Sequence, residues 1–252
     1  MKDQRLVWNP FRIMSPKLHA ELGRLEEMHE VTVSEEQAPG EALLIMISKL
    51  IEMGKILSDW FAAESSAKLE ACERLAEEVR RAEKQATSGL VDSSSVIGQN
   101  LFKIVVRFPS RVERIGGMCE NILNCCRIKS KEGIPFSDKA LGELSGIFAL
   151  ALDMLTNLRD CLVIPNKVLL MHIKVQGQKL AQLVEDARFA HWNRLEAGFC
   201  APAASSIYLE ILDSFKFINE YIKKMDESLM EIVEGSEEAP AAPGETHSIG
   251  GA

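Results

Sequence analysis

Apolar side chains recur at intervals of three and four residues along most of the chain from Glu41 onward, with charged residues between them. This spacing places the apolar positions on one face of a helix and therefore predicts amphipathic helices. The first stripe covers about six helical turns. It consists of Leu43, Ile47, Leu50, Gly54, Leu57 and Phe61.

A second helix is predicted from about Ser66 to Thr87, and we expect Gly89 to end it. Its apolar face consists of Leu69, Cys72, Leu75, Val79 and Ala82. A third helix is predicted over roughly 95–128. Pro109 should bend this third helix, because proline removes one backbone hydrogen bond and clashes with the preceding turn.

Three further helices complete the prediction. Ser137 is a good N-cap for a fourth helix over 138–162. The fifth covers 167–196 and ends near Gly198. Proline is favoured in the first turn of a helix, so the sixth should open at Pro202 and run to about Glu234.

The six predicted helices fall into two groups of three with related sequences. The stretch LAEEVRRA at 75–82 shares Leu, Ala, Val and Ala with LAQLVEDA at 180–187. The separation between Ile115 in the third helix and Ile218 in the sixth is similar to the separation between these two stretches. These matches favour an all-α fold built as a tandem pair of three-helix bundles related by a pseudo-twofold axis.

The predicted domain organisation follows from these groups. The first bundle covers 39–128, a linker covers 129–136, and the second bundle covers 137–233. Residues 1–38 should form an N-terminal extension with a short helix. Residues 234–252 are rich in Gly, Pro and Glu and cannot bury themselves, so we expect a disordered tail.

Composition and charge narrow the choice of partners. The formal net charge is −8 and the isoelectric point about 5.3, and an acidic surface repels phosphate backbones, so we expect no nucleic-acid partner. The densest basic cluster, 127–131, is interpreted as a solvated helix end, with an anionic-ligand site as the alternative.

No segment approaches 18 uninterrupted apolar residues, so we expect no membrane insertion. The six cysteines contain no Cys-x-x-Cys pair, and the N-terminus lacks the pattern of a signal peptide. Both observations favour a reducing cytoplasm, with the thiols serving as small core residues.

Three stretches of the predicted helices resemble segments of a known family. VERIGGMCENI at 112–122 contains two adjacent glycines, each of which disfavours a helix by about 1 kcal/mol relative to alanine. It resembles the Leu-Glu-Arg-Ile-Gly-Asp-His-x-x-Asn-Ile helix of PhoU-type proteins. HWNRLEAGFC at 191–200 resembles the His-x-x-Arg-Leu-x-x-Gly-x-Cys segment of PhoU-like domains. APGEALLIMISKLIEMGKIL at 38–57 resembles the first helix of the PhoU-like domain that follows the membrane part of bacterial sodium/phosphate cotransporters.

The residues that carry the resemblance are Glu113, Arg114, Gly116, Asn121, His191, Arg194, Gly198 and Cys200. The resemblance implies two three-helix bundles and a cytoplasmic role in phosphate homeostasis. Such proteins dock on a phosphate transporter or a sensor kinase and restrain uptake. The resemblance also leaves room for a homodimer.

Many relatives bind metal through pairs of the form Glu/Asp-x-x-x-Asp, since residues four apart share a helix face and hard cations need several oxygen ligands. In this sequence the pattern is incomplete. Glu113 is followed four residues later by Gly117, and Lys216 takes the first ligand position before Glu220. The aligned places on the other two helices hold Cys72 with Ala76 and Gly177 with Ala181. We therefore expect no metal and no cofactor, and we interpret the double glycine as a vacated ligand position where helices approach closely.

No Gly-rich phosphate loop or catalytic motif occurs, so we expect no enzyme activity. The function predicted is that of a non-enzymatic PhoU-like adaptor that docks through an apolar or Met-bearing helix stripe. Two alternatives remain open. One is a metal-binding protein with a reduced carboxylate site that includes Glu113 and Glu220. The other is a PhoU-fold scaffold used for a process unrelated to phosphate.

Overall fold

The computed structural model describes residues 39–63, 66–95 and 97–237, most of which lie in six long helices. Their bounds are α3 Pro39–Ala63, α4 Ser66–Asp92, α6 Phe108–Glu132, α7 Asp138–Val163, α8 Lys167–Glu196 and α9 Pro202–Glu237. A single 3-10 turn, η1 (Ser93–Ser95), and a short helix, α5 (Gln99–Val105), connect α4 to α6. The described residues contain no strand, which confirms the predicted all-α class.

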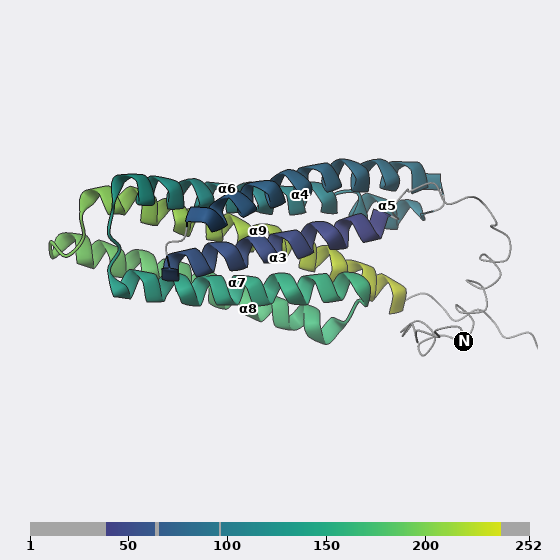
Figure 1. Ribbon diagram of the computed structural model, residues 1–252. Helices are drawn as coiled ribbons and strands as arrows, with labels where there is room; N and C mark the ends of the chain where they lie inside the picture. Colours follow the sequence, from purple (N-terminus) through teal and green to yellow (C-terminus); the bar gives the residue numbers. More distant parts are fainter. Residues whose placement is uncertain (1–38, 64–65, 96, 238–252) are drawn as a thin grey trace, which may run out of the picture. The chain divides into compact units, whose positions relative to one another are not determined.

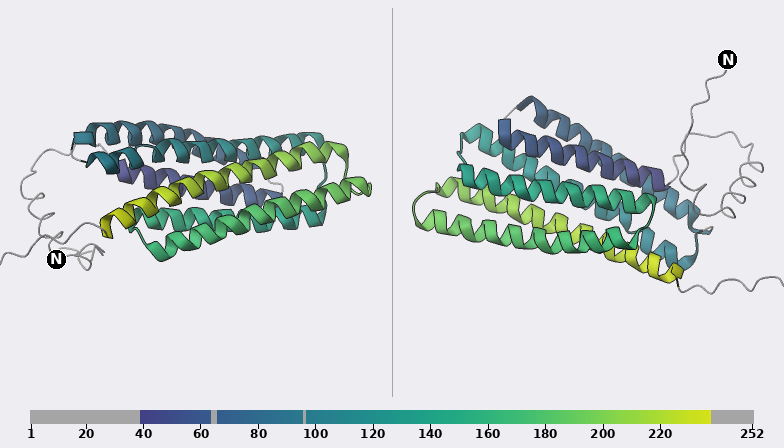
Figure 2. Two further views of the ribbon diagram at one scale, coloured as in Figure 1. Left: turned by 180° about the vertical axis from the view of Figure 1, so that it is seen from behind. Right: turned by 90° about the horizontal axis from the view of Figure 1, so that it is seen from below.

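The long helices run side by side in one compact body (Figure 1). In this view α4 and α6 lie along one side, α7 and α8 along the other, and α3 and α9 between them. Figure 2 shows from behind that α9 runs between α6 and α8. Helices distant in sequence therefore share faces, with α3 packed on α7 and α6 packed on α9.

Contacts within and between the two predicted groups of helices are both extensive. Helix α3 packs on α4 and α6, while α7 packs on α8 and α9. The α6–α9 and α3–α7 contacts join these groups through the same apolar core. The division into bundles 39–128 and 137–233, and the pseudo-twofold relation between them, stay predictions.

The apolar stripes identified from sequence form the core. Every residue of the first stripe is buried, and so is every residue of the second. Trp60 and Tyr208 are the largest side chains that are fully buried. Because burying a Leu, Ile or Met side chain contributes about 1.5–3 kcal/mol, the stripes decide which face of each helix points inward.

Helix starts agree well with the predicted caps. The hydroxyl of Ser137 accepts a hydrogen bond from the amide of Ala140 at 3.3 Å, which satisfies one of the free amides at the start of α7. Asn166 caps α8 in the same way, accepting from the amides of Val168 and Leu169. Pro202 is the first residue of α9, as predicted.

Several predicted boundaries were wrong. Helix α4 continues through Gly89 to Asp92, and the buried side chain of Leu90 anchors this extra turn. The predicted third helix is two helices, because Pro109 lies in the first turn of α6. A proline is tolerated there since its missing amide would have no intrahelical partner.

Helix α6 also extends to Glu132, four residues into the predicted linker of 129–136. Lys129 is buried instead of solvated, and its ammonium lies 5.7 Å from the ring centre of Trp60 and 5.3 Å from that of Phe136. Gly133, with φ of +62°, then ends the helix. At the other end of the chain, α9 reaches Glu237, so the predicted tail from 234 begins too early. The remainder of that tail, and the predicted extension 1–38, lie outside the described residues.

One described helix, α7, is long and apolar enough to cross a bilayer by length and composition. Nine of its residues are buried inside the body, among them Leu144, Ile147 and Leu158. A helix in the core of a bundle passes the same test of length and composition. The expectation of no membrane insertion therefore stays a prediction.

Asp226 on α9 is a buried carboxylate without a hydrogen-bond partner for Oδ1 among the described residues. Its pKa is raised to about 6, chiefly by burial and to a smaller extent by the nearby Glu227, while Lys174 acts in the opposite direction. Because the folded-state pKa lies above the ordinary value of 3.8, folding takes up a proton in the interval between the two. This contribution to stability is complete below about pH 4 and is lost as the pH rises through 6.

We predict that Asp226→Asn removes this pH dependence. The difference in unfolding free energy between the native chain and the variant should change by roughly 2–3 kcal/mol between pH 4 and pH 7, with the native chain favoured at the lower pH. Chemical denaturation of both proteins across that range measures the difference. Parallel stability curves would contradict the assignment.

Candidate functional site

The end of α8 is shaped by a left-handed glycine. Gly198 has φ of +75°, and its amide donates to the carbonyl of Leu195 at 3.1 Å. The next amide, that of Phe199, donates to the carbonyl of Arg194 at 2.8 Å. This pair of bonds is a Schellman motif, which glycine favours because it has no Cβ to oppose the left-handed conformation. The glycine of the His-x-x-Arg-Leu-x-x-Gly-x-Cys segment therefore ends the helix.

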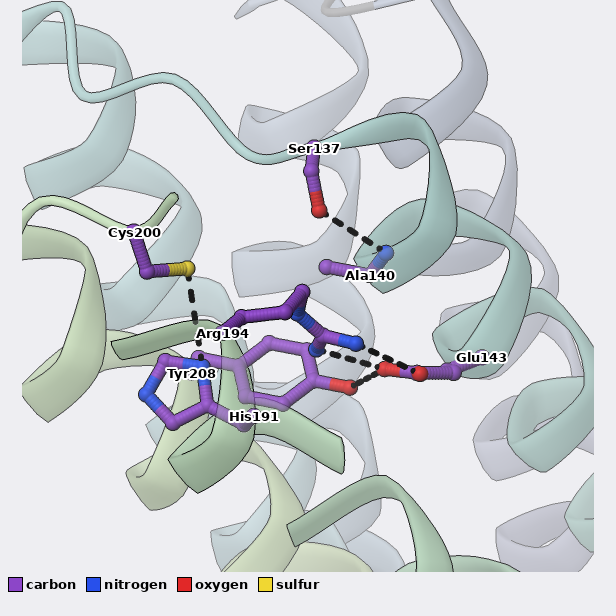
Figure 3. A network of polar contacts seen from close by, with 7 residues as sticks. All are labelled: Ser137, Ala140, Glu143, His191, Arg194, Cys200 and Tyr208. Carbon is purple, nitrogen blue, oxygen red and sulfur yellow. Dashed lines mark hydrogen bonds and ion pairs between the residues drawn. The ribbon is translucent and has the colours of Figure 1, made fainter. Parts of the chain in front are cut away.

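Arg194 joins three helices just before that turn. Its guanidinium donates to both carboxylate oxygens of Glu143 on α7, at 2.7 and 2.8 Å. The hydroxyl of Tyr208 on α9 donates to the same carboxylate at 2.5 Å (Figure 3). We call Glu143, Arg194 and Tyr208 the polar clamp. A two-pronged guanidinium–carboxylate contact fixes both distance and direction, so the clamp sets how α7, α8 and α9 meet.

The clamp is shielded from solvent, with 10% of the Arg194 side chain and 17% of the Glu143 side chain exposed. Burial by itself would raise the pKa of Glu143, but the hydrogen bonds from Arg194 and Tyr208 outweigh it and hold the pKa below its usual value. The bonds to Glu143 raise the pKa of Arg194, and burial raises that of Tyr208. At neutral pH the ion pair is therefore charged and the phenol protonated.

His191 lies beside the clamp and is almost completely buried. Its Nε2 is 2.7 Å from the hydroxyl of Ser205, and its Nδ1 is 3.8 Å from Sγ of Cys200. The imidazole also packs on the ring of Tyr208, with ring centres 4.9 Å apart. Burial and the nearby Arg194 lower the pKa of His191, so it is neutral at pH 7.

The structure thus brings together the four motif residues predicted at 191–200. It adds three that the sequence reasoning missed, namely Glu143, Ser205 and Tyr208. Ser205 and Tyr208 lie in the predicted sixth helix, where their spacing indicates only that they share a face of that helix. Glu143 lies on another helix, and no local signal marks it as the partner of Arg194.

The motif residues of α6 do not form a comparable group. Glu113 is half-buried, Arg114 is exposed, and neither forms an ion pair with another described residue. Asn121 is half-buried and forms no side-chain hydrogen bond with the described part of the chain. These residues lie on α6, whereas the clamp lies on α7, α8 and α9.

The double glycine does not mark a close approach of helices, which corrects the sequence interpretation. A Cβ at Gly116 would lie 3.4 Å from Val79 and 3.5 Å from Leu50, which is ordinary contact, and one at Gly117 would meet nothing within 4 Å. Tighter contacts occur elsewhere: a Cβ at Gly54 on α3 would lie 2.7 Å from Leu152 on α7, and one at Gly177 on α8 would lie 3.1 Å from Oδ1 of Asn219. The side-chain amide of Asn219 on α9 donates to the backbone carbonyl of Gly177 on α8 at 2.9 Å. The absence of a Cβ at Gly177 therefore lets a side chain of α9 contact the backbone of α8 directly.

The carboxylates considered for a reduced metal site are not assembled. Glu220 forms an ion pair with Lys223 at 3.4 Å on α9, while Glu113 lies on α6. Within the described ranges no group of three or more His, Cys, Asp or Glu residues is placed to hold a metal ion.

The buried thiols are held in their protonated form. Five of the six cysteines are buried, and none is in a disulfide. Burial raises the pKa of Cys72, Cys119 and Cys125 to about 12. Since the thiolate is the reactive form, these side chains act as small apolar groups in the core.

Comparison with known proteins identifies the fold. The sequence matches no protein-family model and no curated protein. The structure is similar to that of PhoU from Pseudomonas aeruginosa, with a TM-score of 0.70 and 14% identity over 86% of this chain and 99% of that one. It is also similar to the phosphate transport system regulatory protein PhoU from Streptococcus pneumoniae, with a TM-score of 0.69 and 14% identity over 86% and 97%.

A more distant similarity links the chain to a putative PhoU-like phosphate regulatory protein from Shewanella oneidensis MR-1. The TM-score is 0.51 and the identity 9%, over 81% of this chain and all of the other. At these identities the likeness establishes the PhoU-like helical fold.

We predict that the polar clamp contributes to stability as a unit. Arg194→Met should cost about 3 kcal/mol, because it leaves a buried carboxylate without its cation. Adding Glu143→Leu should recover part of that loss, since the unpaired charge is then gone. Urea denaturation of the single and double variants measures both. As a control, Arg159→Met, which removes an exposed pair with Asp160, should cost less than about 1 kcal/mol. Strictly additive effects would contradict coupling within the clamp.

We predict that Gly117→Ala stabilises the protein by about 0.5–1 kcal/mol. The added methyl meets no atom within 4 Å, and alanine loses less backbone entropy than glycine in a helix. Gly116→Leu should be destabilising, because the larger side chain has to displace Val79 and Leu50. Thermal melts compare the two, and destabilisation by Gly117→Ala would show that the position needs glycine.

Proposed function

We propose that this chain is a cytoplasmic, non-enzymatic regulator of phosphate uptake or homeostasis that docks on a phosphate transporter or on a component of its sensor kinase. The observation that carries the proposal is the PhoU-like fold over 86% of the chain, since two proteins with this fold and nearly complete overlap are PhoU proteins. The motif residues at 112–122 and 191–200 point in the same direction. The closer resemblance to the cotransporter domain stays a prediction from sequence.

The chemistry of the motif residues supports a structural role in place of a catalytic one. The charges of Glu143 and Arg194 satisfy each other, and His191 is buried and neutral. A general acid or base has to reach a substrate and change its protonation state near the working pH. The clamp instead holds fixed charges between packed helices, which suits a protein that acts through its surface.

An apolar groove at one end of the body offers a surface for such a partner. Its volume is about 560 Å³, and its walls are formed by the ends of α3, α4, α6, α7 and α9 and by α5. The lining is nearly all apolar and includes the buried side chains of Leu43, Phe108 and Leu229, together with Leu101 on α5. A groove of this size accepts a few apolar side chains of a docked helix.

The walls of the groove explain how docking could be linked to conformation. Because they come from helices early and late in the chain, an occupant contacts α4 and α5 together with α7 and α9. Any occupant that prefers one arrangement of these helices shifts the population toward it, and the partner's own states shift in return. This is the step by which we expect docking to restrain uptake.

We predict that Leu101→Glu abolishes co-purification with a transporter or sensor-kinase component and raises phosphate uptake in cells that are replete with phosphate. The charge would enter the apolar groove, where burying an unpaired carboxylate is unfavourable. Ile128→Glu is the matched control, because Ile128 has a similar exposure, 43% against 41% for Leu101, and lies near the other end of α6. The control should retain the partner.

Affinity purification from the native host at high and low phosphate, followed by mass spectrometry, identifies what is bound. Recovery of no transporter or kinase component at any phosphate level would contradict the proposed function. If uptake is also unchanged when the chain is deleted, the fold serves a process unrelated to phosphate. Expression in starved and replete cells separates that outcome from weak docking.

A further inference from the structure

A basic segment runs through α5 and the start of α6. Between Asp92 and Glu113 the chain has no acidic residue, although the whole chain carries a formal net charge of −8. Three arginines lie at the N-cap of α6 and along its first turns, at steps of four and three residues: Arg107, Arg111 and Arg114. Because residues three and four apart share a helix face, these side chains lie on one side of α6. Positive charge is therefore concentrated on one helix face of an acidic protein.

Arg111 is held at the junction of α6 and α9, which run side by side (Figure 2). Its Nη1 donates to the backbone carbonyl of Lys224 at 2.7 Å and to the hydroxyl of Ser228 at 2.9 Å. The same hydroxyl donates to the same carbonyl at 2.9 Å, so both partners of the guanidinium are themselves fixed. Its Nε and Nη2 form no hydrogen bond with the described part of the chain. The guanidinium is thus oriented through one nitrogen and has free donors on the others.

The positive charge of Arg111 is not neutralised by a carboxylate. The side chain is half-buried, yet it forms no ion pair with another described residue. Burial and the neighbouring charge of Arg107 lower the pKa of the guanidinium, and the opposing effect of Glu227 is smaller. Removing a charge from water is unfavourable unless an opposite charge compensates for it. The position therefore favours an anion that comes from outside the chain.

Three further cations surround Arg111. Arg107, Arg114 and Lys224 are exposed, and none of them forms an ion pair within the described ranges. We call Arg107, Arg111, Arg114 and Lys224 the cationic patch. Like charges that lie close together repel one another, so the patch is unfavourable as long as no anion is bound to it.

The opposite side of α6 shows the contrast. There Glu120 and Arg127 form ion pairs with Arg80 and Glu73 of α4, both at 2.5 Å. Carboxylates and guanidinium groups balance each other on that side, as they do on most solvated helix faces. The cationic patch lacks such pairs, and this distinguishes it from an ordinary charged surface.

From this arrangement we propose that the cationic patch binds an ionised phosphate group. A guanidinium binds two phosphate oxygens through parallel hydrogen bonds, whereas an ammonium acts on phosphate as a point charge. Arg111 supplies the oriented guanidinium, and Arg107 and Arg114 add charge on either side of it along α6. Lys224 belongs to α9, so the bound group lies at the junction of two helices.

The chemistry of the patch sets its selectivity. Its four cations are hydrogen-bond donors without an acceptor, so they attract any tetrahedral dianion, and sulfate should compete with phosphate. Chloride has one charge and no oxygens to bridge two donors, so it should compete poorly. Arg107 and Arg114 are separated by roughly 10 Å along the helix axis. Pyrophosphate, which is longer and more highly charged, should therefore bind at least about fivefold more tightly than phosphate.

Binding is measured by isothermal titration calorimetry of the purified full chain with phosphate and with pyrophosphate. The ionic strength is held constant, because salt screens exposed charges. We expect saturable binding and a higher midpoint of thermal unfolding, since a ligand of the folded state stabilises it. Sodium chloride at the same ionic strength should produce neither effect. If it reproduces the shift in midpoint, the patch responds only to salt and the proposal is overturned.

The residues are tested first with a pair of exposed positions. Arg107→Gln with Arg114→Gln should weaken pyrophosphate binding at least about tenfold, because two charge-assisted contacts are lost. Arg74→Gln with Arg81→Gln is the matched control, because these arginines are also exposed and seven residues apart but lie on α4. The control should leave the affinity unchanged. An equal loss in both variants would show attraction by net charge alone and would contradict a site on α6.

The role of Arg111 is tested by changing its shape without its charge. Arg111→Lys loses the planar fork, so it should weaken pyrophosphate binding at least about fivefold. Unchanged affinity would overturn the assignment of Arg111 as the oriented donor. Circular dichroism checks the fold, because Arg111 also joins α6 to α9. The pair of changes at Arg107 and Arg114 leaves that contact intact, and it tests the site even if Arg111→Lys does not fold.

The source of the phosphate group is distinguished with lipid vesicles. Phosphatidic acid carries a phosphate monoester of the same chemistry, so sedimentation is compared between phosphatidylcholine vesicles with and without it. Binding of pyrophosphate without binding to these vesicles assigns a soluble ligand, and the reverse assigns a lipid headgroup. Binding of neither would overturn the proposal. None of these measurements depends on a transporter or a sensor kinase.

Discussion

The burial of one shared apolar core is the constraint on which this structure depends. Each long helix presents a stripe of Leu, Ile, Val, Ala or Met to its neighbours, and these stripes meet in a single cluster that runs through all six. Few polar side chains are buried among the described residues: Lys129, Gln176, His191, Arg194, Ser214, Asn219 and Asp226. Most of these contact aromatic rings or hydrogen-bond partners, so hydrocarbon contact supplies the main attraction between helices.

An apolar core does not by itself fix the exact positions of the helices relative to one another. Apolar packing tolerates small changes in helix position, whereas the two-pronged contact between Arg194 and Glu143 does not. The polar clamp therefore fixes one end of α7, α8 and α9, and the apolar groove lies at the end where α7 and α9 finish. The helices are held by the polar clamp at one end of the body and line the groove at the other. An occupant of the groove can therefore change the arrangement of the helices without any catalytic group.

The sequence predicted the parts of the fold that depend on local pattern. Stripes such as Leu43 to Phe61 are periodic, and caps such as Ser137 act within one turn, so both are visible in the sequence. The end of α4 depends on the burial of Leu90 and the end of α6 on the contact of Lys129 with Trp60 and Phe136, which are tertiary contacts. The motif residues at 191–200 were recognised, but Glu143 could not be paired with Arg194 because it lies on another helix. The exposed apolar side chains of α8, among them Val168, Phe189 and Trp192, were missed because the strong buried stripe on the other face of that helix conceals the second pattern.

The main attraction between these helices is apolar contact, and we expect no metal ion to bridge them. The most direct test is elemental analysis of the purified protein, combined with thermal unfolding before and after treatment with a strong chelator. The account predicts less than stoichiometric metal and the same unfolding midpoint in both samples. Stoichiometric iron or magnesium, together with a marked fall in the midpoint once it is stripped, would contradict the account.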